Sequence, residues 1–413
     1  EIVSAAGSSN GRRPGPRPLP LHLGMASCTL AGAVAGLPAA QAGLVPWHPD
    51  LSSRARQIHA DMQDHPLPHL LTAVMGEADR RLKQTIAGIE TYQTHPHHRQ
   101  ARDPEPCYRM GQAKLLDYAP DLPGDRAVLF VPSLINRHYV LDLEEDNSLM
   151  RWLARHGIRP FLVDWGDPGP LERHYDTGDY VLGPLCHAIE HICELTGQSA
   201  LPVVGYCMGG TLVTAAAQLM PERVRALGLM AAPWDFQADL SKPAEQFAQL
   251  SALWLPVVRQ LGEMPVDLIQ AFFAALDPNL AQRKFARFAT LPKDSAAAKQ
   301  FVALEDWLND GIALAAPTAE DCFNGWYGEN RTMTGKWTIR GTVIDPARID
   351  APAFCAIPAN DRIVPPASAR GLADRLDRVQ VETPKAGHIG MVVGSRAYQN
   401  LWRPLRQWLE IIL

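Results

Sequence analysis

The sequence predicts an α/β fold built on a mostly parallel, doubly wound sheet. From residue 126 onward, short apolar runs alternate with stretches whose apolar residues recur at helical spacing. Such alternation is typical of βαβ units, which pair their strands in parallel and place helices on both faces of the sheet. The chain has 413 residues, of which 46% are hydrophobic and 20% charged. This globular balance argues against wholesale disorder.

The alternation can be followed element by element. It lapses between about residues 235 and 345, where aromatic-rich helical stretches follow one another, and then returns. We therefore expect one α/β domain, residues 126–413, interrupted by a mainly helical cap at about 235–345. The expected strands lie at 127–131, 160–163, 201–205, 224–230, 353–357 and 379–382, and the expected helices at 149–156, 180–196, 209–220 and 401–413.

Two regions precede this domain. Residues 1–50 are rich in Gly, Pro and Ala and are expected to be a poorly ordered, low-complexity segment. Residues 51–125 are expected to be helical, because apolar positions between 67 and 92 recur at helical spacing. An apolar stretch follows Arg12 and Arg13 as in a signal peptide, but Gly and Pro dilute it. We expect residues 1–24 to be a tag, processing scar or misassigned start, and no segment to span a membrane.

Composition excludes several classes of protein. The net charge is −5, from 39 basic and 44 acidic residues, whereas nucleic-acid-binding proteins normally carry a basic excess. Seven cysteines are widely spaced without a CxxC pair, which argues against a disulfide scaffold or zinc module and favours a reducing cytosol. Three histidines in residues 95–98 surround a proline without helical spacing, so a solvated loop is expected there and no metal site.

The sharpest motif is Gly205-Tyr206-Cys207-Met208-Gly209. It matches the G-x-S-x-G nucleophile elbow with Cys in place of Ser, and it stands between an expected strand and helix as that motif requires. We therefore expect the α/β-hydrolase fold, with glycines 205, 209 and 210 forming the elbow and the N–H of Met208 aimed at an oxyanion. The alternative is a buried, inert cysteine in a strand–helix turn.

A nucleophile of this kind needs an acid and a base, which in this fold follow in the order Cys, Asp, His. Asp361 follows the expected strand at 353–357, and His388 follows the expected strand at 379–382. Both stand at strand carboxyl ends, where sites form in open α/β sheets. We therefore expect a triad of Cys207, Asp361 and His388, the alternative being a surface Asp and a capping His.

The second oxyanion donor of this fold comes from the loop after an early strand. Here that loop is residues 132–139, and the expected donor is the N–H of Leu134 or of Ile135. Asn136 and Arg137 are expected to order the loop, or Arg137 to meet a phosphate.

Seven segments together resemble the polyhydroxyalkanoate synthases, over roughly residues 67–412. Through this resemblance, Cys207 matches the family's nucleophile, Asp361 its catalytic aspartate and His388 its catalytic histidine. Arg362 follows the aspartate where the synthases commonly carry His. The segments are VPSLINRHYVLDL (131–143), LVDWGDPGP (162–170), GYCMGG (205–210), APWDF (232–236), DWLNDG (306–311), NDRIVP (360–365) and GHIGMVVG (387–394).

The resemblance implies an acyltransferase that polymerises (R)-3-hydroxyacyl-coenzyme A thioesters into polyester and releases coenzyme A through an acyl-Cys intermediate. No separate cofactor is expected, since coenzyme A is part of the substrate and a product. The expected partners are the polyester chain and granule surface, with either a homodimer or an accessory synthase subunit, and the expected location is the cytoplasm at granules. Two alternatives stay open: a thioesterase or esterase using the same triad, and a catalytically inert granule-associated protein.

Overall fold

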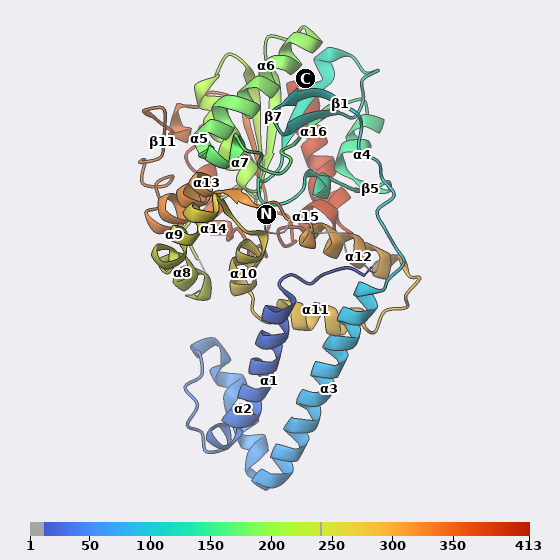
Figure 1. Cartoon of the computed structure of the whole chain (residues 1–413), viewed down its shortest axis with the longest axis vertical. Coiled ribbons are helices and arrows are strands. Elements are labelled where there is room, and N and C mark those ends of the chain that lie inside the picture. The colour runs from blue at the N-terminus through green and yellow to red at the C-terminus, as the bar shows by residue number, and fades with distance from the viewer. Residues whose placement is uncertain (1–11, 240–241) are drawn as a thin grey trace. The chain divides into compact units, whose positions relative to one another are not determined.

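The structure is a computed structural model that describes residues 12–239 and 242–413 (Figure 1). The chain divides into two compact units. One comprises the described residues up to His97 together with Asp277–Asn309, and the other comprises His98–Leu276 and Asp310–Leu413.

The second unit is built on a sheet of eight strands within the described residues. Six of them run parallel, while β2 pairs antiparallel with both of its neighbours. This mixed, mostly parallel sheet confirms the predicted fold class. In spatial order the strands are β1 (Pro106–Met110), β2 (Ala113–Asp117), β6 (Arg159–Asp164), β3 (Ala127–Val131), β7 (Leu201–Tyr206), β8 (Val224–Met230), β13 (Ala353–Ala356) and β14 (Val379–Glu382).

The central strands are continuous apolar runs because both of their faces are covered. Every residue of β3 and of β7 is buried, as expected for a parallel sheet between two helical layers. Helices α6 and α7 lie on one side of the sheet, and α4 and α16 on the other (Figure 1). The helices of this framework are α4 (Leu149–Arg155), α5 (Thr177–Tyr180), α6 (Cys186–Thr196), α7 (Met208–Leu219), α14 (Pro366–Ala373), α15 (Gly390–Val393) and α16 (Arg403–Ile412).

Between β8 and β13 the chain is mainly helical, but it does not stay in one unit. Helices α11 and α12 group with the N-terminal residues. In that unit Phe285 and Phe288 share a core with Ile89 and Tyr92. The elements of the segment are α8 (Lys242–Gln249), α9 (Ser251–Leu261), β9 (Glu263–Met264), α10 (Val266–Leu276), α11 (Leu280–Phe288), α12 (Ala296–Asn309), β10 (Leu314–Ala315), α13 (Ala316–Glu320), a π-helical turn (Asp321–Gly328), β11 (Thr338–Ile339) and β12 (Thr342–Val343).

The first unit also contains α1 (Leu19–Gln41), α2 (Ser52–Gln63) and α3 (Leu67–Gln93). Helix α1 occupies a stretch that the composition suggested would be poorly ordered. Pro20 stands in the first turn, where proline is tolerated, and Ala and Leu dominate the helix although Pro38 lies inside it. Strands β1 and β2 similarly occupy part of a region expected to be helical. His95 is buried rather than solvated, with Nε2 2.9 Å from the carbonyl oxygen of Lys293.

Helix α1 bears on the expectation that no segment spans a membrane. Among the described residues it is long and apolar enough to do so, judged by length and composition alone. The expectation required an uninterrupted apolar run, whereas this helix mixes apolar residues with Gly, Ser and Thr but contains no charged residue. Core helices and N-terminal signal sequences meet the same criteria, so this finding carries no further conclusion.

Candidate active site

Cys207 stands alone between the end of β7 and the start of α7. Its backbone adopts φ 55° and ψ −130°, a conformation that is strained for any residue other than glycine. Two hydrogen bonds hold this turn: Cys207 N–H donates to the carbonyl of Met230 at 2.9 Å, and Gly210 N–H donates to the carbonyl of Cys207 at 2.8 Å. The chain therefore has the strained strand–turn–helix geometry of a nucleophile elbow.

The glycines around Cys207 are required because the turn leaves no room for side chains. A Cβ atom at Gly205 would lie 2.5 Å from the Cα of Gly210. One at Gly209 would lie 2.2 Å from the carbonyl oxygen of Val131, and one at Gly210 would lie 2.3 Å from the Cβ of Ala232. The expected elbow glycines are thus explained by close backbone packing.

The start of α7 creates a favourable site for negative charge. Met208 is the first residue of this 12-residue helix, so its N–H has no acceptor within the helix. The N-terminal end of the helix dipole also stabilises a thiolate. Cys207 is partly exposed, which leaves its sulfur accessible to a substrate.

Asp361 and His388 meet at the carboxyl edge of the sheet, as the sequence predicted. His388 Nδ1 lies 2.7 Å from Asp361 Oδ2, and both side chains are buried. The other carboxylate oxygen, Oδ1, accepts hydrogen bonds from the N–H groups of Ile363 and Val364, each at 2.9 Å. These donors fix the carboxylate, which in turn fixes the orientation of the imidazole ring.

The imidazole also interacts with the cysteine. Burial alone would lower the pKa of His388, but the carboxylate of Asp361 and a hydrogen bond and charge interaction with Cys207 outweigh it and raise the pKa to about 10. A protonated imidazole between a carboxylate and a sulfur stabilises a thiolate. The structure therefore brings the three predicted residues together in an arrangement suited to nucleophilic catalysis.

The loop at residues 132–139 is held at several points. Trp165 Nε1 donates to the carbonyl of Pro132 at 3.0 Å. Ile312 N–H donates to the carbonyl of Ile135 at 3.0 Å. Leu134 is buried, and the N–H of Ile135 lies 3.4 Å from Ser133 Oγ, at the limit of a hydrogen bond. Both predicted oxyanion donors thus belong to an ordered loop.

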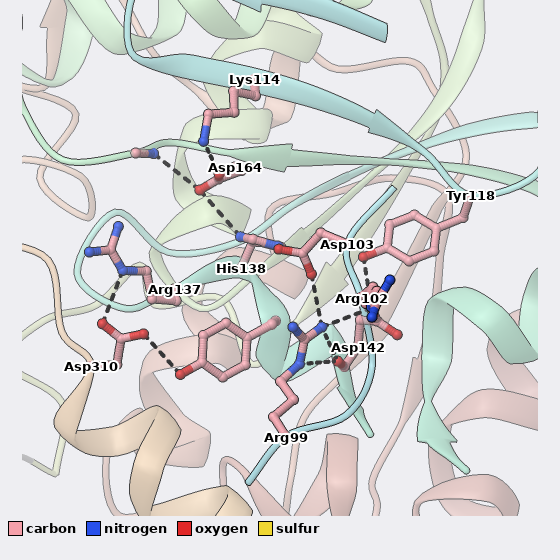
Figure 2. A network of polar contacts seen from close by, with 12 residues as sticks. Arg99, Arg102, Asp103, Lys114, Tyr118, Arg137, His138, Asp142, Asp164 and Asp310 are labelled. Carbon is pink, nitrogen blue, oxygen red and sulfur yellow. Dashed lines mark hydrogen bonds and ion pairs between the residues drawn. The ribbon is translucent and has the colours of Figure 1, made fainter. Parts of the chain in front are cut away.

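Arg137 has a structural partner on each side. It forms ion pairs with Asp167 at 2.9 Å and with Asp310 at 3.2 Å. Figure 2 shows its guanidinium beside Asp310. Of the two expectations for Arg137, these contacts favour loop ordering over phosphate binding.

Two tyrosines that interact with the triad were not predicted from the sequence. Tyr206 packs its ring 5.1 Å from that of His388, and its hydroxyl donates to the His388 carbonyl at 3.5 Å. Burial, and then the charge of Cys207, raise the pKa of Tyr327, so this phenol interacts electrostatically with the cysteine. Tyr206 was visible inside the elbow motif, whereas Tyr327 belongs to the π-helical turn, far away in sequence and without a motif.

No group of three or more His, Cys, Asp or Glu side chains is placed to hold a metal ion within residues 12–239 and 242–413.

Comparison with known proteins gives consistent matches. A family model described as alpha/beta hydrolase fold matches residues 126–395. The Poly(3-hydroxyalkanoate) polymerase subunit PhaC of Haloferax mediterranei is 30% identical over 312 residues, which cover 74% of this chain and 63% of that protein. The protein of the same name from Synechocystis sp. is 30% identical over 68% of this chain and 77% of its own length. That from Allochromatium vinosum is 27% identical over 83% of this chain and 98% of its own length.

The matched part of the chain spans less than two thirds of the length of two halophile relatives. It covers 63% of the Haloferax mediterranei protein and 66% of the Haloarcula marismortui protein.

Proposed function

Because the chain belongs to the alpha/beta hydrolase fold family and, within it, to the poly(3-hydroxyalkanoate) polymerases, we propose that it polymerises (R)-3-hydroxyacyl-coenzyme A thioesters into a polyester. The reaction proceeds through a covalent acyl intermediate on Cys207 and releases coenzyme A. One observation carries the proposal: a cysteine at a nucleophile elbow interacts with a buried His388–Asp361 pair.

In the first step the thiolate of Cys207 attacks the thioester carbonyl carbon. The carbonyl oxygen becomes an oxyanion that the N–H of Met208, and that of Leu134 or Ile135, stabilise. The intermediate collapses by breaking the bond to the coenzyme A sulfur, which takes a proton from the imidazolium of His388. Coenzyme A leaves as a thiol, and the acyl group remains on Cys207.

In the second step the 3-hydroxyl group of another hydroxyacyl unit attacks the acyl-Cys carbonyl. Neutral His388 accepts the hydroxyl proton as the new C–O bond forms, and the C–S bond to Cys207 then breaks. Asp361 orients His388 and stabilises the imidazolium that forms. From this turn the buried carboxylate of Asp361 contacts the imidazole, whereas Arg362 is exposed.

A cysteine suits this chemistry better than a serine. Attack of a thiolate on a thioester replaces one C–S bond with another, so the acyl enzyme retains the reactivity of its substrate. An acyl-Ser would be an oxygen ester and a poorer donor for a step that forms an oxygen ester.

Polymerisation also requires that the hydroxyl group, rather than water, reach the acyl-Cys. Aromatic side chains of the helical segment form an apolar cluster, in which Trp254 and Phe272 pack against Phe323 at ring-centroid distances of 4.7 and 5.2 Å. Phe272 also contacts Tyr327, with 5.0 Å between ring centroids, and Tyr327 interacts electrostatically with Cys207. We assign this cluster the role of excluding water.

The proposal extends to where the protein works. A polyester product is insoluble in water, so the enzyme would work at the surface of polyester granules in the cytoplasm. The relatives from Haloferax mediterranei and Synechocystis sp. are named as subunits. We therefore propose that this chain works with an accessory subunit or as a homodimer.

The test is to mix the purified protein with (R)-3-hydroxybutyryl-coenzyme A and to follow coenzyme A release and turbidity together. Coenzyme A release with growing turbidity is expected. Release with stoichiometric free 3-hydroxy acid and no polymer would establish a hydrolase instead. No release at all, with Cys207 reacting with iodoacetamide no faster than a free thiol, would favour an inert granule-associated protein.

A further inference from the structure

We propose that His138, held as an imidazolium between Asp103 and Asp164, is a positioning residue for the loop that carries the oxyanion N–H groups. The inference rests on the proposed function, because the loop matters to catalysis only if acyl transfer takes place at Cys207.

The geometry around His138 is that of a buried cation between two carboxylates. His138 Nδ1 lies 3.2 Å from Asp164 Oδ1, and Nε2 lies 3.3 Å from Asp103 Oδ2. The His138 side chain is only 5% exposed. Asp164 ends β6, and Asp103 precedes β1, so two different segments approach the ring from opposite sides. Figure 2 shows this arrangement.

Only the doubly protonated ring suits this environment. A neutral imidazole would present a lone pair to one of the carboxylates. Neither ring nitrogen is aligned for a hydrogen bond, so attraction between charges has to carry both contacts. Burial acts to lower the pKa of His138, but the two carboxylates outweigh it and raise the pKa. Although burial opposes the change, His138 in turn lowers the pKa of Asp103 to about 2 and that of Asp164 further.

Each carboxylate also has a second cation. Lys114 Nζ, on β2, lies 3.3 Å from Asp164, and Arg99 lies 2.9 Å from Asp103. Tyr139 turns its ring edge-on to His138, with 6.1 Å between the centroids. The imidazolium therefore belongs to a network in which positive and negative groups alternate.

The network continues from Arg99 to a fully buried carboxylate. Asp142 lies 3.1 Å from Arg99, and the Tyr118 hydroxyl donates to it at 3.0 Å (Figure 2). Arg151 also lies 2.7 Å from Asp142. The charge of Asp142 is balanced by these partners, so Asp103 and Asp164 are the carboxylates that pair with His138.

The network acts on the oxyanion loop because His138 ends that loop. Two consecutive residues at the end of β6 hold its two ends: Trp165 donates to the carbonyl of Pro132, and Asp164 contacts His138. The backbone N–H groups of Leu134 and Ile135 lie between these two points in the chain. Loss of the His138 contact would loosen this end of the loop, which Arg137 would still tie to Asp167 and Asp310, while the Pro132 end would keep its contact with Trp165.

A loosened loop end would lower kcat without changing the reactivity of Cys207. Oxyanion donors act only at about 2.7–3.1 Å from the developing charge, and complete loss of one donor costs roughly 100- to 1,000-fold in kcat. A displaced donor is expected to cost roughly 10- to 100-fold. The interaction between His388 and Cys207 does not involve the loop, so the reactivity of the sulfur should stay unchanged.

The test compares His138→Gln with the parent protein and with His174→Gln, a matched change of an exposed histidine. For His138→Gln, kcat for coenzyme A release should fall roughly 10- to 100-fold with KM nearly constant, while iodoacetamide labels Cys207 at the parental rate. His138→Lys restores a positive charge and should recover part of the lost kcat. His174→Gln should behave like the parent.

Asp103→Asn provides a second variant in case His138→Gln does not fold. It removes one of the two carboxylates that raise the pKa of His138, while His388 keeps its partner Asp361. The decline of kcat at alkaline pH should therefore begin at a lower pH than in the parent. A purely structural role would lower the melting temperature without moving this limb.

The outcomes separate the two claims. Parental kcat in folded His138→Gln, or an unmoved pH profile in Asp103→Asn, would overturn the role of His138 alone. Absence of coenzyme A release from the parent protein would overturn the proposed function, and the role of His138 with it.

Discussion

The substitution Asp361→Asn should stop chain growth while allowing slow acylation of Cys207. An amide at this position can still accept hydrogen bonds from Ile363 and Val364 through its oxygen. Its NH₂ group would then face His388 Nδ1, only 2.7 Å away in the parent. The ring would have to carry its proton on Nε2, the nitrogen that should accept a proton from the substrate hydroxyl.

The pKa of His388 and a known protease variant together give the size of the expected loss in the elongation rate. The rise of the His388 pKa from 6.5 to about 10 corresponds to about 5 kcal/mol of preference for the imidazolium form. Asp361 is the largest contributor to that rise. The equivalent Asp-to-Asn change in a serine protease costs about 10⁴-fold in kcat through the wrong tautomer, and a similar loss is expected for elongation. An ordinary thiol of pKa about 8.5 is already about 3% ionised at pH 7, so acylation should slow far less than elongation.

The assay is intact-protein mass spectrometry after rapid mixing with (R)-3-hydroxybutyryl-coenzyme A. Asp361→Asn should gain the mass of one acyl unit and then stall, whereas the parent should carry longer chains. Asp374→Asn, a change of an exposed carboxylate, is the matched control and should elongate normally. Elongation by Asp361→Asn at the parental rate would show that Asp361 is not the triad acid.

Three further changes test the site from other directions. Cys207→Ala should abolish acyl transfer yet leave the melting temperature nearly unchanged, because the residue is partly exposed; residual turnover would exclude a covalent mechanism at this sulfur. Gly209→Ala should destabilise the protein by about 1–3 kcal/mol in urea unfolding, since its Cβ would lie 2.2 Å from a backbone oxygen, whereas Gly183→Ala has open space and should not. His388 has a raised pKa of about 10 in the folded protein, so the stability it contributes is complete below about pH 6.5 and lost as pH rises through 10. Urea unfolding of the parent should therefore show a larger loss of stability between pH 7 and 10 than that of His388→Gln, and equal losses would contradict the ion pair.

Local constraints explain which parts of the site were predictable. The elbow could be predicted from the sequence because only glycine fits beside Val131 and Ala232. The tight backbone packing therefore requires the glycines that make up the motif. Asp361 and His388 could be found because each directly follows a strand, and parallel strands end at one edge of the sheet. These signals depend on neighbours in the chain rather than on distant contacts.

The features that escaped prediction depend on contacts between distant segments. Tyr327 interacts electrostatically with Cys207 although 120 residues separate them in the chain, and no local sequence pattern indicates that interaction. The role proposed for His138 depends on its contacts with Asp103 and Asp164, which come from two other parts of the chain. Helix α1 was missed for a different reason, since its glycines and prolines suggest disorder although most of its residues favour a helix.

The central claim is that Cys207 carries the growing polyester chain. The most direct test is to quench the purified protein during turnover of (R)-3-hydroxybutyryl-coenzyme A, digest it, and analyse the peptide containing Cys207 by mass spectrometry. The account predicts a ladder of adducts on Cys207, spaced by the mass of one hydroxybutyryl unit and absent from Cys207→Ala. Turnover with an unmodified Cys207 peptide, or with the ladder on another residue, would contradict it.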